Sequence, residues 1–123
     1  MNYPAQRCRQ LARLLREEQL DALLISHPIN VTYLTGFSGE SSHLVLHRKK
    51  TLLVSDFRFT AQIAEECPGL EAHIRPSAQP LQEATAAVLN RLGCRSVDCG
   101  QGDPRLNDGR LRAPFSWIRV RTA

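Results

Sequence analysis

The sequence predicts an α/β domain with a five- or six-stranded mixed sheet flanked by helices. Apolar residues recur every three or four positions near the N-terminus and again near residue 85, which is typical of amphipathic helices. Short continuous apolar runs lie between these segments and are typical of strands buried on both faces of a sheet. Because helix-like and strand-like segments alternate along the chain, the order favours one sheet with helices packed on it.

The first expected element is a helix over residues 4–19, where Pro4 suits the first turn because its missing N–H costs nothing there. Residues 21–26 form a continuous apolar run and are the first expected strand. Asn30 is expected to cap a helical turn over residues 31–35. The glycine directly after this turn can end it in a left-handed conformation.

Two β-rich runs follow at residues 43–47 and 51–55. A basic turn joins them, so they are expected to be antiparallel neighbours. A helix is expected over residues 59–67, where a Pro-Gly pair ends it, and a fourth strand over residues 70–75. The most regular apolar stripe predicts a helix over residues 80–92, again followed by a glycine.

The chain changes character after the last strand of this series, which is expected over residues 95–99. Residues 1–100 carry 11 Lys/Arg and 10 Asp/Glu, whereas residues 101–123 carry five Arg and two Asp. The sequence therefore predicts one domain over residues 1–100 and a basic tail over residues 101–123. Glycine and proline punctuate the tail as in a truncated or disordered segment, and within it only residues 116–120 have the pattern of a further strand.

Composition argues against several classes of function. The basic excess lies mostly in the tail and forms no basic stripe on the domain, so nucleic-acid binding is not expected. No apolar run approaches the roughly 20 residues that span a bilayer. The start of the chain lacks the apolar core of a signal peptide, so a reducing cytoplasm is the expected location. Free thiols are accordingly expected for Cys8, Cys67, Cys94 and Cys99.

No metal site is expected within the chain. The cysteines lack the paired spacing of zinc ligands. His43 and His47 have the four-residue spacing of a zinc-protease helix, but the residues between them predict a strand, in which four residues span roughly 13 Å. The two imidazoles could therefore not share one ion, and no glutamate lies between them to serve as a base.

Two segments carry the candidate site residues. Residues 33–37 (Tyr-Leu-Thr-Gly-Phe) end a helical turn at a sheet edge, where their apolar side chains either cap the core or face a partner. Residues 56–59 (Asp-Phe-Arg-Phe) follow a strand at its carboxyl end, where ligands of α/β proteins tend to bind. The candidate substrate or interface residues are Tyr33, Phe37, Asp56, Phe57, Arg58 and Phe59.

The chemistry of the second segment leaves two interpretations open. Asp56 can cap the helix that follows, because a carboxylate accepts bonds from free backbone N–H groups. Arg58 offers a planar fork that can hold a carboxylate through two hydrogen bonds. Alternatively, Arg58 forms a surface ion pair with Asp56 or Glu65. No residue of the chain is expected to be catalytic.

These two segments, in this order and with a strand pair between them, resemble the N-terminal domain of the creatinase/prolidase/Xaa-Pro aminopeptidase family (metallopeptidase family M24). The resemblance covers about residues 4–100. It implies a ribonuclease H-like arrangement and a non-catalytic domain that supports oligomerisation and substrate access. It also implies that Arg58 contacts a substrate carboxylate, with Phe57 or Phe59 as an apolar wall.

The resemblance further implies a homo-oligomer and Pro-containing peptides as the substrates of full-length relatives. In these relatives two divalent ions (Mn, Co or Zn) lie in a separate catalytic domain, whose Asp, His and Glu ligands this chain does not carry. Whether the chain has an activity of its own is left open by the sequence. The alternative is a stand-alone module that binds a protein or peptide without catalysis.

Overall fold

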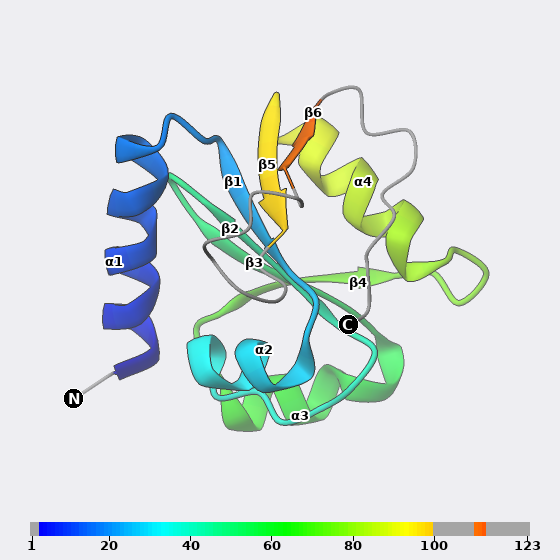
Figure 1. Cartoon of the computed structure of the whole chain (residues 1–123). Helices are drawn as coiled ribbons and strands as arrows, with labels where there is room; N and C mark the ends of the chain where they lie inside the picture. The colour runs from blue at the N-terminus through cyan, green and yellow to red at the C-terminus, as the bar shows by residue number, and fades with distance from the viewer. Residues whose placement is uncertain (1–2, 100–109, 113–123) are drawn as a thin grey trace.

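Six strands form one mixed sheet in the order β4-β3-β2-β1-β5-β6. The computed structural model describes residues 3–99 and 110–112 (Figure 1). The strands are β1 (Ala22–Ile25), β2 (His43–His47), β3 (Thr51–Asp56), β4 (Glu71–Arg75), β5 (Ser96–Cys99) and β6 (Arg110–Arg112). The helices are α1 (Tyr3–Glu17), α2 (Pro28–Thr35), α3 (Thr60–Glu66) and α4 (Leu81–Arg91), with a short 3-10 helix η1 (Phe57–Phe59) before α3.

The pairing confirms the predicted mixed sheet. β1, β2 and β3 are antiparallel neighbours, as expected for the two runs joined by the basic turn. β4 pairs in parallel with β3, and β5 pairs in parallel with β1. Because β1 and β3 run in the same direction, the segments that follow them, α2 and η1–α3, lie at the same end of the sheet (Figure 1).

The second helix begins earlier than the sequence predicts. His27 caps it by accepting a hydrogen bond from the Ile29 amide at its Nδ1, and Pro28 occupies the first turn. The prediction that Asn30 caps this helix is therefore wrong: Asn30 lies inside α2, because a proline with its fixed φ starts a helix well. Gly36 ends the helix at φ 84°, as predicted.

A sixth strand, β6, lies within the segment predicted as a tail. Its three residues pair antiparallel with β5, with Leu111 opposite Val97. The predicted further strand at residues 116–120 lies outside the described residues. The domain boundary at residue 100 remains a prediction.

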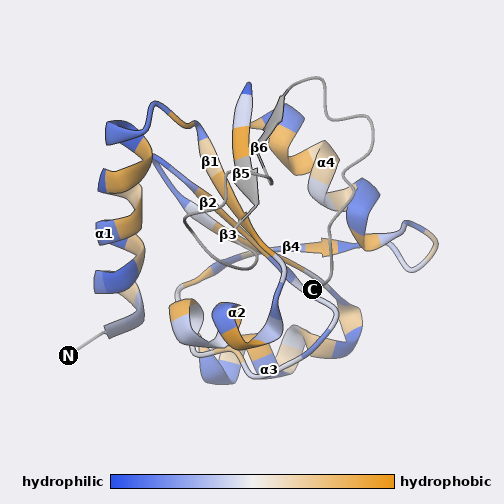
Figure 2. Ribbon diagram, in the orientation of Figure 1, coloured by the Kyte–Doolittle hydropathy of each residue, from blue (hydrophilic) through white to orange (hydrophobic). Residues whose placement is uncertain are grey.

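The core has two sides, one on each face of the sheet. α4 covers one face, and α1, α2 and α3 cover the other (Figure 1). β1 contributes to both: Ala22 and Leu24 pack on the α4 side, whereas Leu23 and Ile25 pack on the other, as expected for a strand buried on both faces. Apolar residues gather in the central strands and on the parts of α1 and α4 that face them (Figure 2).

Candidate functional site

The candidate site is built by two parallel strands that end side by side. β3 and β4 pair with Asp56 in register with Arg75, so their carboxyl ends bring these two side chains together. Arg58 follows Asp56 by two residues in η1. Asp56 also caps η1, because its Oδ1 accepts a hydrogen bond of 3.0 Å from the Arg58 amide.

Asp56 is the centre of a small ionic cluster. Arg58 holds it in a two-point contact, with Nε 2.9 Å from Oδ1 and Nη2 2.8 Å from Oδ2. Nη2 of Arg75 lies 3.3 Å from the same Oδ2. The sequence leaves two roles open for Arg58, a contact to a ligand carboxylate and an ion pair with Asp56 or Glu65. The structure contains the ion pair with Asp56.

The carboxylate is buried and charged. Asp56 is only 2% exposed, and hydrogen bonds from the Arg58 side chain lower its pKa to about 2. Two guanidinium groups therefore surround one carboxylate, and the cluster keeps a net positive charge. Such a cluster can attract an anion at whichever guanidinium faces solvent.

That guanidinium is the one on Arg58. Its side chain is 55% exposed, whereas that of Arg75 is 15% exposed. Nη1 of Arg75 donates to the Gln79 carbonyl at 2.7 Å, and its buried Nε has no hydrogen-bond partner among the described residues. Arg75 therefore positions Asp56 from within, and Asp56 positions Arg58 toward solvent.

The aromatic residues on either side of Arg58 have different environments. Phe57 is exposed at 64% of its surface. Phe59 is partly buried, and its ring makes a T-shaped contact with the Phe37 ring, with centroids 5.7 Å apart. The Arg58 guanidinium lies 5.2 Å from the centre of the Phe59 ring. Phe57 is thus the aromatic side chain of this segment that a partner can reach.

Phe37 is a core residue. It is completely buried in the cluster that α2 and α3 build on the sheet. A side chain at Gly39 would lie 2.2 Å from the Phe37 ring, so the glycine permits this close packing. The sequence leaves both a partner contact and core packing open for Phe37. The burial of Phe37 and of neighbouring Leu34 places both side chains in the core.

Tyr33 is exposed on α2, whereas the residues of the ionic cluster lie on β3, β4 and η1. The Arg7 guanidinium of α1 lies 3.9 Å from the centre of the Tyr33 ring, and its Nη1 donates to the Tyr33 carbonyl at 2.8 Å. These contacts fasten the start of α1 to α2. Tyr33, Phe57 and Arg58 all lie on segments that follow the same end of the sheet.

Arg75 is the site residue that the sequence analysis missed. It ends the strand predicted over residues 70–75, but no pattern in the sequence pairs that strand with the one that ends at Asp56. The contact between Asp56 and Arg75 follows only once the two strands are known to be parallel neighbours whose last residues are in register. Periodicity alone gives no such register, because it identifies strands and not their neighbours.

Among the side chains that the structure describes in residues 3–97, no three His, Cys, Asp or Glu come together as a metal site. His43 is instead buried under α4, where its Nδ1 lies 3.0 Å from the Thr85 hydroxyl. Burial lowers the pKa of His43 to about 4, so the imidazole is neutral at pH 7. None of the helices described here is long and apolar enough to cross a bilayer.

A family model described as the creatinase/prolidase N-terminal domain matches residues 7–98. The chain belongs to this family. A curated relative, the uncharacterized peptidase YqhT of Bacillus subtilis (strain 168), is 32% identical over 88 residues, which are 72% of this chain and 24% of the relative. The creatinase/prolidase N-terminal domain seen here thus spans about a quarter of the length of that relative.

Solved structures agree with this assignment. The N-terminal domain of the cytoplasmic peptidase PepQ from Mycobacterium tuberculosis is 30% identical with a TM-score of 0.68, covering 76% of this chain and 72% of that one. A Xaa-Pro aminopeptidase from Streptococcus pyogenes is 25% identical with a TM-score of 0.69, covering 82% of this chain and 77% of that one. The fold is that of the N-terminal domains of prolidase and Xaa-Pro peptidase-like proteins.

Proposed function

We propose that this chain serves as the non-catalytic N-terminal domain of a cytoplasmic, metal-dependent Xaa-Pro peptidase. The family match over residues 7–98 carries the proposal, and the similarity to proteins named as peptidases supports it. The two divalent ions (Mn, Co or Zn) and the residues that bind them would belong to a separate catalytic domain. The substrate would be a Pro-containing peptide.

The proposed role of the ionic cluster is to present one cation to a peptide or to the catalytic domain. Arg58 is exposed, and two hydrogen bonds that it donates to a buried carboxylate fix the orientation of its guanidinium. Exposed Phe57 beside it offers an apolar contact. Because the Arg58 side chain is already held in one orientation, little further conformational entropy of that side chain is lost when a carboxylate binds to its open side.

A test replaces Arg58 by alanine in the longer peptidase that carries this domain. We expect kcat/KM for an Xaa-Pro peptide to fall roughly ten- to a hundredfold, as for loss of a charged hydrogen bond. Arg91→Ala is the matched control, since Arg91 is an exposed arginine in the last turn of α4. Wild-type kinetics and wild-type assembly of the Arg58→Ala enzyme would show that Arg58 has no such role.

The exposed apolar residues at this end of the sheet also support a homo-oligomer. Ile29 and Tyr33 on α2 and Phe57 on η1 are each more than half exposed. Large exposed apolar side chains that lie at one end of a domain favour burial against a partner. Sedimentation over a wide concentration range should show dimers that a Tyr33→Ser, Phe57→Ser variant loses. A clean monomer at high concentration would exclude this interface.

A further inference from the structure

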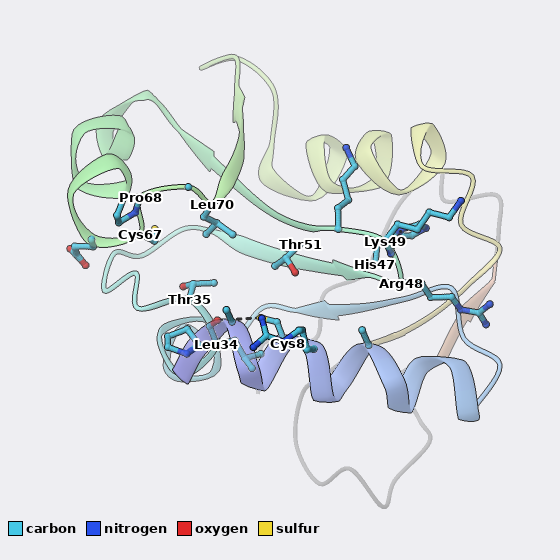
Figure 3. A pocket seen from close by; sticks show the side chains of 17 residues that line it. Cys8, Leu34, Thr35, His47, Arg48, Lys49, Thr51, Cys67, Pro68 and Leu70 are labelled. Atoms are coloured by element: carbon cyan, nitrogen blue, oxygen red, sulfur yellow. Dashed lines mark hydrogen bonds between the residues drawn. The ribbon is translucent and has the colours of Figure 1, made fainter. Parts of the chain in front are cut away.

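A groove of about 640 Å³ runs along the inner side of α1 (Figure 3). Cys8, Leu34 and Leu70 contribute to an apolar lining. One end is formed by the turn between β2 and β3, and the other by the segment between α3 and β4. This volume lies in the range typical of ligand-binding sites.

The end at the β2–β3 turn is basic. Lys50 is paired with Glu71 at 3.1 Å, and Nε of Arg48 donates to the Leu20 carbonyl at 2.6 Å. Arg9 from α1 and Lys49 from the turn are exposed and line the same groove. Neither side chain has a hydrogen bond or ion pair with another residue in the described part of the chain. Two cations without such a partner in the described residues, one from α1 and one from the β2–β3 turn, therefore line the groove.

The pKa of His47 also reflects the positive charge at the β2–β3 turn. It also lines the groove, and its pKa is lowered first by burial. Asp21 opposes this shift, whereas the charges of Lys49, Arg48 and Lys50 lower the pKa further. An anion at this end would relieve the repulsion among these groups.

The opposite end of the groove is acidic. Glu66 lines it and accepts hydrogen bonds from the Ser38 hydroxyl at 2.6 Å and from Gln62 at 2.8 Å. The Ser38 contacts and the Gln62 contact lower the pKa of Glu66, so it is ionised at neutral pH. A continuous polyanion such as a nucleic acid would meet this carboxylate. An occupant with negative charge at one end only would not.

We propose that this groove binds a short polypeptide segment in which an acidic residue is followed by apolar residues. The acidic side chain would bind the cations that line the groove, Lys49 from the β2–β3 turn and Arg9 from α1, and the apolar side chains would lie against Cys8, Leu34 and Leu70. Charge complementarity at the basic end and the uncharged lining beyond it select this occupant. The site is distinct from the cluster at Asp56, because the groove meets β3 at its first residue, Thr51, and the cluster lies at its last.

The test measures binding of a fluorescein-labelled peptide, two aspartates followed by alternating leucine and alanine, by fluorescence anisotropy with the full chain. Arg9→Glu combined with Lys49→Glu should weaken binding roughly tenfold or more, because both cations reverse sign. Arg13→Glu combined with Arg16→Glu is the matched control: it makes the same change of charge on exposed α1 residues that do not line the groove. This control should change the dissociation constant less than about twofold.

Two altered peptides sharpen the result. Replacing both aspartates by asparagine should weaken binding to the wild-type chain. The wild-type chain and the Arg9→Glu, Lys49→Glu variant should then bind this peptide with the same dissociation constant. Replacing the leucines by serine should weaken binding to both proteins. A thermal unfolding curve for each variant confirms that the fold is intact.

Three results would overturn the proposal. The first is equal weakening by both charge-reversal pairs, which would indicate attraction by net charge alone. The second is no saturable binding up to about 1 mM peptide, the limit of weak recognition. The third is tighter binding of dodecanoate or of an oligothymidylate that Arg9→Glu, Lys49→Glu abolishes, since the groove would then recognise a lipid-like or nucleic-acid anion.

Discussion

The two faces of the sheet are packed to different degrees. On the α4 face the strands and the helix form one cluster of buried residues, with only Leu81 and Leu92 of the described residues partly buried against it: Ala22, Leu24, Val45, Leu52, Val54, Ala84, Ala86, Val88, Leu89, Cys94 and Val97. On the other face three helices share the cover, and several apolar side chains are only partly buried, among them Cys8, Leu23 and Leu70. The groove lies on this second face.

This difference separates stability from binding. The α4 face forms a single cluster of mostly buried side chains, so substitutions there should act through folding. The face shared by α1, α2 and α3 contains a groove lined by apolar side chains and by cations that have no partner in the described residues. Tyr33 on α2 and Phe57 and Arg58 on η1 are exposed at the end of the sheet where β1 and β3 finish. Substitutions there should act more on partners than on the fold.

Matched leucine truncations measure this contrast directly. Leu89→Ala on the α4 face should cost about 3–4 kcal/mol of unfolding free energy, because it opens a cavity at a fully buried position. Leu70→Ala in the partly buried wall of the groove should cost about 1 kcal/mol. Urea unfolding of both variants checks the values. Equal losses would mean that the two faces contribute alike to stability.

Asp56→Ala tests the cluster at the carboxyl ends of β3 and β4. We expect a loss of about 2–3 kcal/mol, because the mostly buried Arg75 would lose its carboxylate. Glu65→Ala, on the exposed side of α3, should change stability by less than about 0.5 kcal/mol. Unfolding in urea at pH 7 gives both values, and a neutral Asp56→Ala variant would show that the cluster does not support the fold.

The same carboxylate predicts an acid limit. The pKa of Asp56 is lowered in the folded chain to about 2, so the unfolded chain takes up the proton first as pH falls. Its contribution should be complete above about pH 4, the ordinary range of Asp, and lost as pH falls toward 2. Asp56→Ala should lack this part of the acid transition.

His43 predicts a second pH dependence, at milder acidity and on the α4 face. Its pKa is lowered to about 4 by burial, so below about pH 6.5 the unfolded chain binds a proton that the folded chain does not. Stability should therefore fall by about 2.5 kcal/mol between pH 6.5 and 4. His43→Gln should flatten this part of the profile. An unchanged slope in the variant would assign it to other groups.

The sequence predicted the fold well where a single periodic pattern decides an element. The apolar stripe of α4 and the apolar run of β1 identify both elements, because the pattern is local and burial is strong. The start of α2 was placed wrongly, since a histidine at the cap and a proline after it competed with Asn30 as the signal. The strand at Arg110–Arg112 was not expected, because three residues carry too little pattern.

The candidate site was predicted only in part. The segment 56–59 identified Asp56 as a helix cap and Arg58 as an exposed cation, because both properties follow from local sequence. Arg75 was missed because its contact depends on strand register. The sequence left the exposure of Phe37 undecided, since a glycine two residues later lets its ring turn inward, and no local pattern encodes that.

The central claim is that this domain supplies contacts and no peptide-bond chemistry of its own. The most direct measurement is hydrolysis of Xaa-Pro peptides by the purified chain, with manganese or cobalt added. We predict no turnover above the buffer blank at any metal concentration. Turnover that follows the chain through successive purification steps would contradict the claim.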